Sequence, residues 1–134
     1  MLMALNDKRQ VKKNRTFLLS LGHSLDGLVT VFKEERNMKK HVAMMILVSI
    51  CAAIFQISET EWLWLALSIS MVIINEVWNT VIENLVDLTT GHKYNEIAKK
   101  VKDMSAAAVL LSALFAMIVG CLIFIPQLLE LVFD

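Results

Sequence analysis

Long apolar runs separated by short charged segments dominate the pattern of this chain. Three of these runs, at residues 42–58, 62–86 and 104–126, approach or exceed the length of a membrane span, because a hydrocarbon core of roughly 30 Å needs about 20 helical residues. Ahead of them, between residues 15 and 32, apolar side chains recur every three or four positions, which predicts one face of an amphipathic helix. That face contains Phe17, Leu18, Leu21, Leu25, Leu28, Val29 and Phe32.

The pattern predicts an all-α membrane protein with a single domain, residues 1–134. It would comprise a basic tail (1–14), an interfacial helix (15–36) and the three transmembrane helices. Basic residues at its start and Phe and Leu on its face suit a helix lying in the membrane interface. Packing of this face on other helices is the alternative, and both can hold.

Two polar connections separate the predicted transmembrane helices. We expect a tight turn at Ser58-Glu59-Thr60-Glu61 and a longer polar loop over residues 89–100, with Gly91 as its turn residue. Trp62 and Trp64 would lie in an interfacial aromatic belt. The small residues that follow Met104 suit close helix packing.

Composition supports a membrane protein. Of the 134 residues, 57% are hydrophobic, with one Pro and four Gly, which is too apolar for an ordinary soluble domain. The formal net charge is zero, so charge does not point to nucleic acid, and no nucleic-acid partner is expected. Cys51 and Cys121 lie in apolar runs without metal-binding spacing, so we expect both to be small buried hydrophobic residues.

The distribution of charge predicts the topology. All 13 Lys and Arg lie in two blocks, residues 8–40 and 93–102. The first interhelical turn and the C-terminus carry only acidic residues. The positive-inside rule therefore predicts a cytoplasmic N-terminus, three spans and a C-terminus outside.

A stripe of acidic and amide residues interrupts the second apolar run. At about 100° per residue, Glu76, Asn79, Glu83 and Asp87 fall on one narrow face of a helix. Acids within a membrane-length helix are costly and by default indicate a functional site. The alternative is a helix that emerges into water, which suits Asp87 and Glu83 better than Glu76, because apolar residues continue on both sides of Glu76.

Carboxylates at a membrane boundary favour a hard cation with oxygen ligands, and Mg²⁺ typically takes one or two carboxylates plus phosphate oxygens. The chain contains neither GxxxxGK[ST] nor GxGxxG. A nucleotide would therefore be held by side chains and a metal. Because three thin helices enclose little space, we expect such a site to form between the subunits of an oligomer.

These residues carry a family resemblance. The pattern ExxNxxxExxxD at 76–87, followed by Lys102-Asp103 and a small-residue run, resembles the bacterial diacylglycerol kinase and undecaprenol kinase family over roughly residues 15–126. The segment Glu35-Arg36-Asn37, followed by His41, is more similar to the undecaprenol kinase branch of Gram-positive bacteria.

The resemblance implies a homotrimer in the bacterial plasma membrane, with ATP and Mg²⁺ at sites shared between subunits. It implies Glu76 as the catalytic base, Asn79 as the residue that orients Glu76 or the acceptor, and Glu35 and Glu83 as metal ligands. Its remaining nucleotide-contacting positions correspond to His23, Lys93, Tyr94, Asn95, Lys102 and Asp103. One departure is Arg15, because the family's N-terminal Arg would align at Thr16.

The expected activity is transfer of the ATP γ-phosphoryl group to undecaprenol. Diacylglycerol is the alternative acceptor. Two alternative functions outside the kinases are a small proton-coupled membrane transporter and a structural membrane subunit. The clustering of acids at one interface, rather than at mid-membrane, disfavours the transporter.

Overall fold

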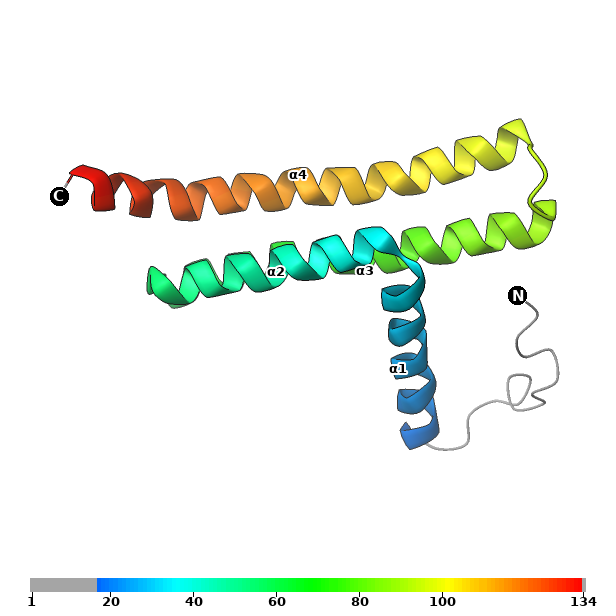
Figure 1. Ribbon diagram of the computed structural model, residues 1–134, viewed down its shortest axis with the longest axis horizontal. Helices are drawn as coiled ribbons and strands as arrows, with labels where there is room; N and C mark the ends of the chain where they lie inside the picture. Colours follow the sequence, from blue (N-terminus) through cyan, green and yellow to red (C-terminus); the bar gives the residue numbers. More distant parts are fainter. Residues whose placement is uncertain (1–16, 134) are drawn as a thin grey trace.

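The structure, a computed structural model, describes residues 17–133 as four helices (Figure 1). They are α1 (Phe17–Glu34), α2 (Arg36–Ile54), α3 (Glu59–Thr90) and α4 (Glu96–Phe133). No strand occurs within these residues, and the predicted all-α fold is confirmed. The predicted basic tail, Arg15, Thr16 and the last residue, Asp134, lie outside the described part.

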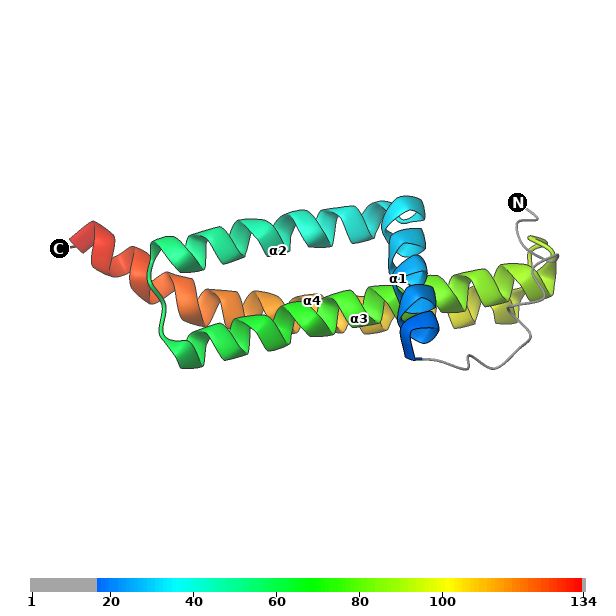
Figure 2. The same ribbon diagram turned by 90° about the horizontal axis from the view of Figure 1, so that it is seen from below.

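The three longer helices form an elongated bundle, in which α2 and α4 both run alongside α3 (Figures 1 and 2). Each is long and apolar enough to cross a membrane, as predicted. At about 1.5 Å per residue, α3 and α4 are longer than a hydrocarbon core of roughly 30 Å. Their ends therefore extend beyond it, and the polar loop between them lies at one end of the bundle.

Helix α1 turns away from the long axis of the bundle (Figure 2). The predicted helix 15–36 is interrupted at Glu35, whose backbone is extended (φ −96°, ψ 119°) and which precedes the first residue of α2. All seven residues of the predicted apolar face are exposed, and Val31 is the buried residue of α1. The face is largely exposed in the single chain, so it is available to contact the membrane interface.

The connection between α2 and α3 differs from the prediction. Helix α2 ends at Ile54, and the chain turns at Gln56, which has a φ of +50°. Residues 58–61, expected to form the turn, instead begin α3. Ser58 caps α3 through a capping box in which its side chain accepts from the backbone N–H of Glu61, while the Glu61 carboxylate accepts from the Ser58 backbone. The segment is polar, which suggested a turn, but its Ser-x-x-Glu pattern is a signal for the start of a helix.

The connection between α3 and α4 contains the predicted Gly91 turn. Gly91 adopts the left-handed conformation (φ 58°, ψ 37°) that glycine tolerates best. The Asn95 side chain then accepts hydrogen bonds from the backbone N–H groups of Ile97 and Ala98. Because this capping starts α4 at Glu96, the third long helix begins well before the apolar run at 104, and it continues through Pro126 to Phe133.

Few side chains are buried in the single chain. The hydrophobic cluster of α2, α3 and α4 comprises Ala52, Ile57, Leu65, Val119 and Ile123. Most of the other large apolar residues point outwards. The expectation that both cysteines are buried is wrong for Cys121, which is exposed, whereas Cys51 is half-buried; both thiols are free. Helices of this kind need lipid or further subunits around them.

Candidate active site at the acidic stripe of α3

The middle of the acidic stripe faces the inside of the bundle. Its last residues, towards the α3–α4 loop, are more exposed. Glu76 and Asn79 retain only 1% and 8% of their accessible surface, whereas Glu83 and Asp87 are half-buried. Hydroxyls line the same part of α3, where Thr80 donates to the carbonyl of Glu76 at 2.9 Å. A buried acid beside an amide is costly unless it is used or paired.

One imidazole lies close to the Glu76 carboxylate in the described chain. The Nε2 atom of His41, on α2, lies 3.9 Å from the Glu76 Oε2 atom. No hydrogen bond to the Glu76 carboxylate is found within residues 17–133. A carboxylate that is enclosed but not hydrogen-bonded is available to accept a proton from a bound hydroxyl group.

Asn79 is held between two helices. Its amide nitrogen donates to Glu83 Oε1 at 3.0 Å, and its oxygen accepts from the Ser105 hydroxyl of α4 at 2.7 Å. Both ends of the amide are therefore oriented, and Glu83 is fixed in turn. The arrangement joins three members of one polar network across the α3–α4 interface.

Two further carboxyl groups, those of Glu35 at the start of α2 and of Glu83, lie near enough to Glu76 to interact with it electrostatically. Oxygen donors of this kind suit Mg²⁺, which takes one or two carboxylates in addition to phosphate oxygens. Within residues 17–133 no group of three or more His, Cys, Asp or Glu has the geometry of a complete metal site. Any cation at this position would need further oxygen ligands besides these carboxylates, such as phosphate oxygens.

The polar end of the stripe is tied to α4. Asp87 Oδ1 lies 2.6 Å from Lys102 Nζ, and Asp87 Oδ2 lies 3.8 Å from the ring of His92. Asp87 follows the apolar run, and the hydrogen bond from Lys102 lowers the pKa of its carboxyl group. The pair fixes a lysine at the loop end of the bundle.

A polar cavity of about 380 Å³ opens beside this pair. The residues that line it include five of the predicted nucleotide-contacting positions: Lys93, Tyr94, Asn95, Lys102 and Asp103. Three lysines surround the cavity, the third being Lys99, whose Nζ lies 2.6 Å from Asp103 Oδ2. A cavity rimmed by lysines is suited to phosphate groups.

The predicted site residues are not all gathered in one place. Tyr94 is 81% exposed and Asn95 is engaged in capping α4. His23 is exposed on α1 and makes no hydrogen bond or ion pair within residues 17–133. The single chain thus brings Glu35, Glu76, Asn79 and Glu83 together, places the loop residues and Lys102 at a neighbouring cavity, and leaves His23 apart.

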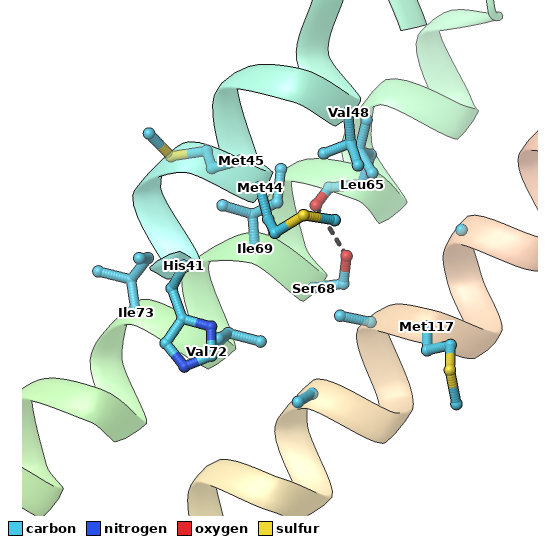
Figure 3. A pocket seen from close by; sticks show the side chains of 13 residues that line it. His41, Met44, Met45, Val48, Leu65, Ser68, Ile69, Val72, Ile73 and Met117 are labelled. Atoms are coloured by element: carbon cyan, nitrogen blue, oxygen red, sulfur yellow. Dashed lines mark hydrogen bonds between the residues drawn. The ribbon is translucent and has the colours of Figure 1, made fainter. Parts of the chain in front are cut away.

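An apolar groove lies on the other side of Glu76. It has a volume of about 380 Å³ and is lined by α2, α3 and α4 (Figure 3). His41, Met44 and Met45 contribute from α2, together with Ile69 and Val72 from α3. The acidic stripe therefore has a polar cavity towards the loop and an apolar groove towards the middle of the bundle.

Three contacts of the stripe were not predicted from the sequence: those of His41, Ser105 and Lys102. His41 was noted only for its family resemblance, and Ser105 only as a small residue. No pattern within the chain indicated either contact, because each joins α3 to another helix. Asp87 was part of the stripe, but its pairing with Lys102 across the Gly91 turn was not predicted.

Comparisons with known proteins agree with this architecture. The family model described as prokaryotic diacylglycerol kinase matches residues 22–124. The undecaprenol kinase of Bacillus subtilis is 38% identical over 112 residues, covering 84% of this chain and 90% of that protein. The diacylglycerol kinase of Synechocystis is 36% identical over 129 residues, covering 92% and 74%. That of Escherichia coli K12 is 29% identical over 102 residues, covering 76% and 83%.

The match covers the stripe, the polar loop, helices α2 and α3, and α4 as far as residue 124, which are the elements that form the candidate site. The chain belongs to the prokaryotic diacylglycerol kinase family of membrane lipid kinases.

Proposed function

We propose that this protein is an ATP-dependent undecaprenol kinase that produces undecaprenyl phosphate. The observation that carries the proposal is the buried Glu76 carboxylate, with Asn79 oriented beside it, in a helix long and apolar enough to span a membrane. A lipid alcohol keeps its tail in the bilayer, so its hydroxyl group can reach a base at this position.

In the proposed reaction, Glu76 accepts the proton of the lipid hydroxyl group. The hydroxyl oxygen forms a bond to the γ-phosphorus while the bond from that phosphorus to the β–γ bridging oxygen breaks, giving lipid phosphate and ADP. Phosphoryl transfer depends mainly on positioning and charge neutralisation. Asn79, fixed at both ends of its amide, would orient Glu76 or the acceptor.

Glu35 and Glu83 would hold Mg²⁺, which when bound neutralises phosphate oxygens. Lys102 and Asp103 would contact the nucleotide phosphates and their surroundings, with Lys93, Tyr94 and Asn95 from the loop. His23 would reach the nucleotide only if α1 or another subunit brings it closer, since it stands apart in the single chain.

We further propose that the protein acts as a homotrimer with sites shared between subunits. The single chain leaves most of its large apolar side chains exposed and does not bring all the proposed site residues together. In the bacterial plasma membrane, the N-terminus and the site would face the cytoplasm and the C-terminus the outside, by the positive-inside rule.

The proposal also specifies which lipid alcohol is the acceptor. Glu35-Arg36-Asn37 and His41 favour undecaprenol, as does similarity to the Bacillus subtilis undecaprenol kinase, although the other relatives compared are diacylglycerol kinases. A polyprenol offers one hydroxyl group and no ester oxygens. A site built for diacylglycerol would be expected to satisfy two ester carbonyls, because unpaired buried polar groups are costly.

The test of acceptor choice is kcat/KM for undecaprenol and for diacylglycerol in the same mixed micelles. The proposal predicts a higher value for undecaprenol. A higher value for diacylglycerol would assign the protein to the sister activity and leave the proposed roles of Glu76 and Asn79 standing.

A further inference from the structure

His41 lies at the end of the apolar groove that is nearest to the acidic stripe. On α3 the groove is lined up to Val72 and Ile73, and Glu76 follows one helical turn later. Figure 3 shows the His41 imidazole among hydrocarbon and thioether side chains of α2 and α3. His41 is therefore the residue at which the apolar groove meets the buried carboxylate.

Its imidazole is the polar group in the groove lining that makes no hydrogen bond within residues 17–133, its nearest charged neighbour being Glu76 at 3.9 Å. The other polar side chain in the lining, Ser68, donates its hydroxyl hydrogen to the carbonyl of Leu65 at 2.9 Å. His41 makes no hydrogen bond within the described part of the chain. The partly exposed His41 imidazole can therefore form a hydrogen bond with a ligand that enters the groove.

The distance between His41 and Glu76 suits a group held between them. At 3.9 Å, the Nε2 and Oε2 atoms are too far apart for a direct hydrogen bond, but an alcohol oxygen can lie about 2.8 Å from each of them. An alcohol both donates and accepts. It can therefore donate to the Glu76 carboxylate while it accepts from an N–H group at Nε2.

We propose that His41 is an acceptor-binding residue, which holds the hydroxyl group of the lipid alcohol jointly with Glu76. The inference rests on the proposed kinase function and adds a residue to it. Apart from His41, the groove lining contains no polar side chain that lacks a hydrogen bond. This suits a lipid alcohol that carries no other polar group close to its hydroxyl.

The contact has a defined part in the reaction. As the oxygen bonds to the γ-phosphorus and its proton passes to Glu76, the imidazole retains its own N–H hydrogen and continues to donate to the same oxygen. That oxygen then bridges carbon and phosphorus in the product. His41 thus fixes the attacking atom, and Glu76 alone takes the proton.

The test compares His41→Leu with His41→Gln, because glutamine keeps an N–H donor on a side chain of similar reach. Kinetics are measured with undecaprenol and ATP varied separately, after each variant has been checked for wild-type oligomeric size and thermal stability. We expect His41→Leu to lower kcat/KM for the lipid by about 10- to 100-fold, since the lost hydrogen bond is to a reacting group. The KM for ATP should stay unchanged, and His41→Gln should recover most of the loss.

Ser68→Ala, in the same groove, is the matched control and should retain wild-type kinetics. Where His41→Leu does not assemble, His41→Asn takes its place: its shorter amide should fail where His41→Gln succeeds. Equal activity of the leucine or asparagine variant and the glutamine variant would overturn the inference. If the wild-type protein transfers phosphate to no lipid alcohol, the kinase proposal itself falls, which is a separate result.

Discussion

Replacing Glu76 by Gln removes a proton acceptor and little else. The two side chains have the same shape, so the packing of a residue that is 1% exposed is kept. Glu83 cannot easily substitute, because its Oε1 atom already accepts from Asn79. Bulk water has little access to the position. The loss in kcat should therefore come from the absence of the general base itself.

General-base catalysis contributes about 10²- to 10⁴-fold, which corresponds to about 2.7–5.4 kcal/mol in the activation free energy. The enclosure of Glu76 argues for a loss of at least about 10²-fold in kcat. The affinity for ATP with Mg²⁺ should be largely kept, because Glu76 is not one of the proposed metal ligands.

The assay is steady-state transfer of phosphate to undecaprenol in mixed micelles, with calorimetry for the binding of ATP with Mg²⁺. Glu59→Gln is the matched control, since Glu59 is an exposed acid in the first turn of the same helix, and it should be close to wild type. A Glu76→Gln protein that turns over within about threefold of wild type would show that Glu76 is not the general base, because that is far below the effect of a general base.

Three further predictions address the metal, the topology and the polar network. Glu35→Ala and Glu83→Ala should each weaken the binding of ATP with Mg²⁺ by at least about tenfold, as loss of metal-site partners does; unchanged calorimetric affinity in both would show the ligand assignment to be wrong. With the native cysteines replaced, a cysteine at Asn95 should react with a membrane-impermeant thiol reagent only from the cytoplasmic side, and one at Thr60 only from outside; the reverse labelling would overturn the charge argument. Ser105→Ala should reduce the free energy of unfolding by about 0.5–1.5 kcal/mol. It should also lower kcat, because the Asn79 amide that Ser105 orients is released; unaltered kinetics would mean that this orientation is not used.

Much of the fold could be predicted from local pattern. Long apolar runs identify the three long helices, and a spacing of three and four places Glu76, Asn79, Glu83 and Asp87 on one face, which the structure places towards the inside of the bundle. These features depend only on helical periodicity, which is the same in any helix.

The exact helix ends could not be predicted from hydropathy, because capping decides them. Ser58 begins α3 through its capping box, and Asn95 begins α4 within a segment that looks like a loop. Both signals consist of polar residues, which hydropathy assigns to connections. The extended backbone at Glu35, which separates α1 from α2, has no comparable signal.

The partners of the stripe could not be predicted because they come from other helices. The contact of Asn79 with Ser105 and that of Asp87 with Lys102 both depend on how α4 returns along α3 after Gly91. The approach of His41 to Glu76 depends on the rotation of α2. Rotation and register between helices are set by packing across the whole bundle.

In the proposed function, the acidic stripe catalyses the phosphorylation of a lipid alcohol. The most direct measurement incubates the purified protein in micelles with undecaprenol, Mg²⁺ and ATP labelled in its γ-phosphoryl group, and then extracts the lipid. We expect label in undecaprenyl phosphate that depends on the lipid alcohol and is lost in Glu76→Gln. Absence of label from the lipid fraction with undecaprenol and diacylglycerol alike, in protein of intact oligomeric size, would contradict the proposed function.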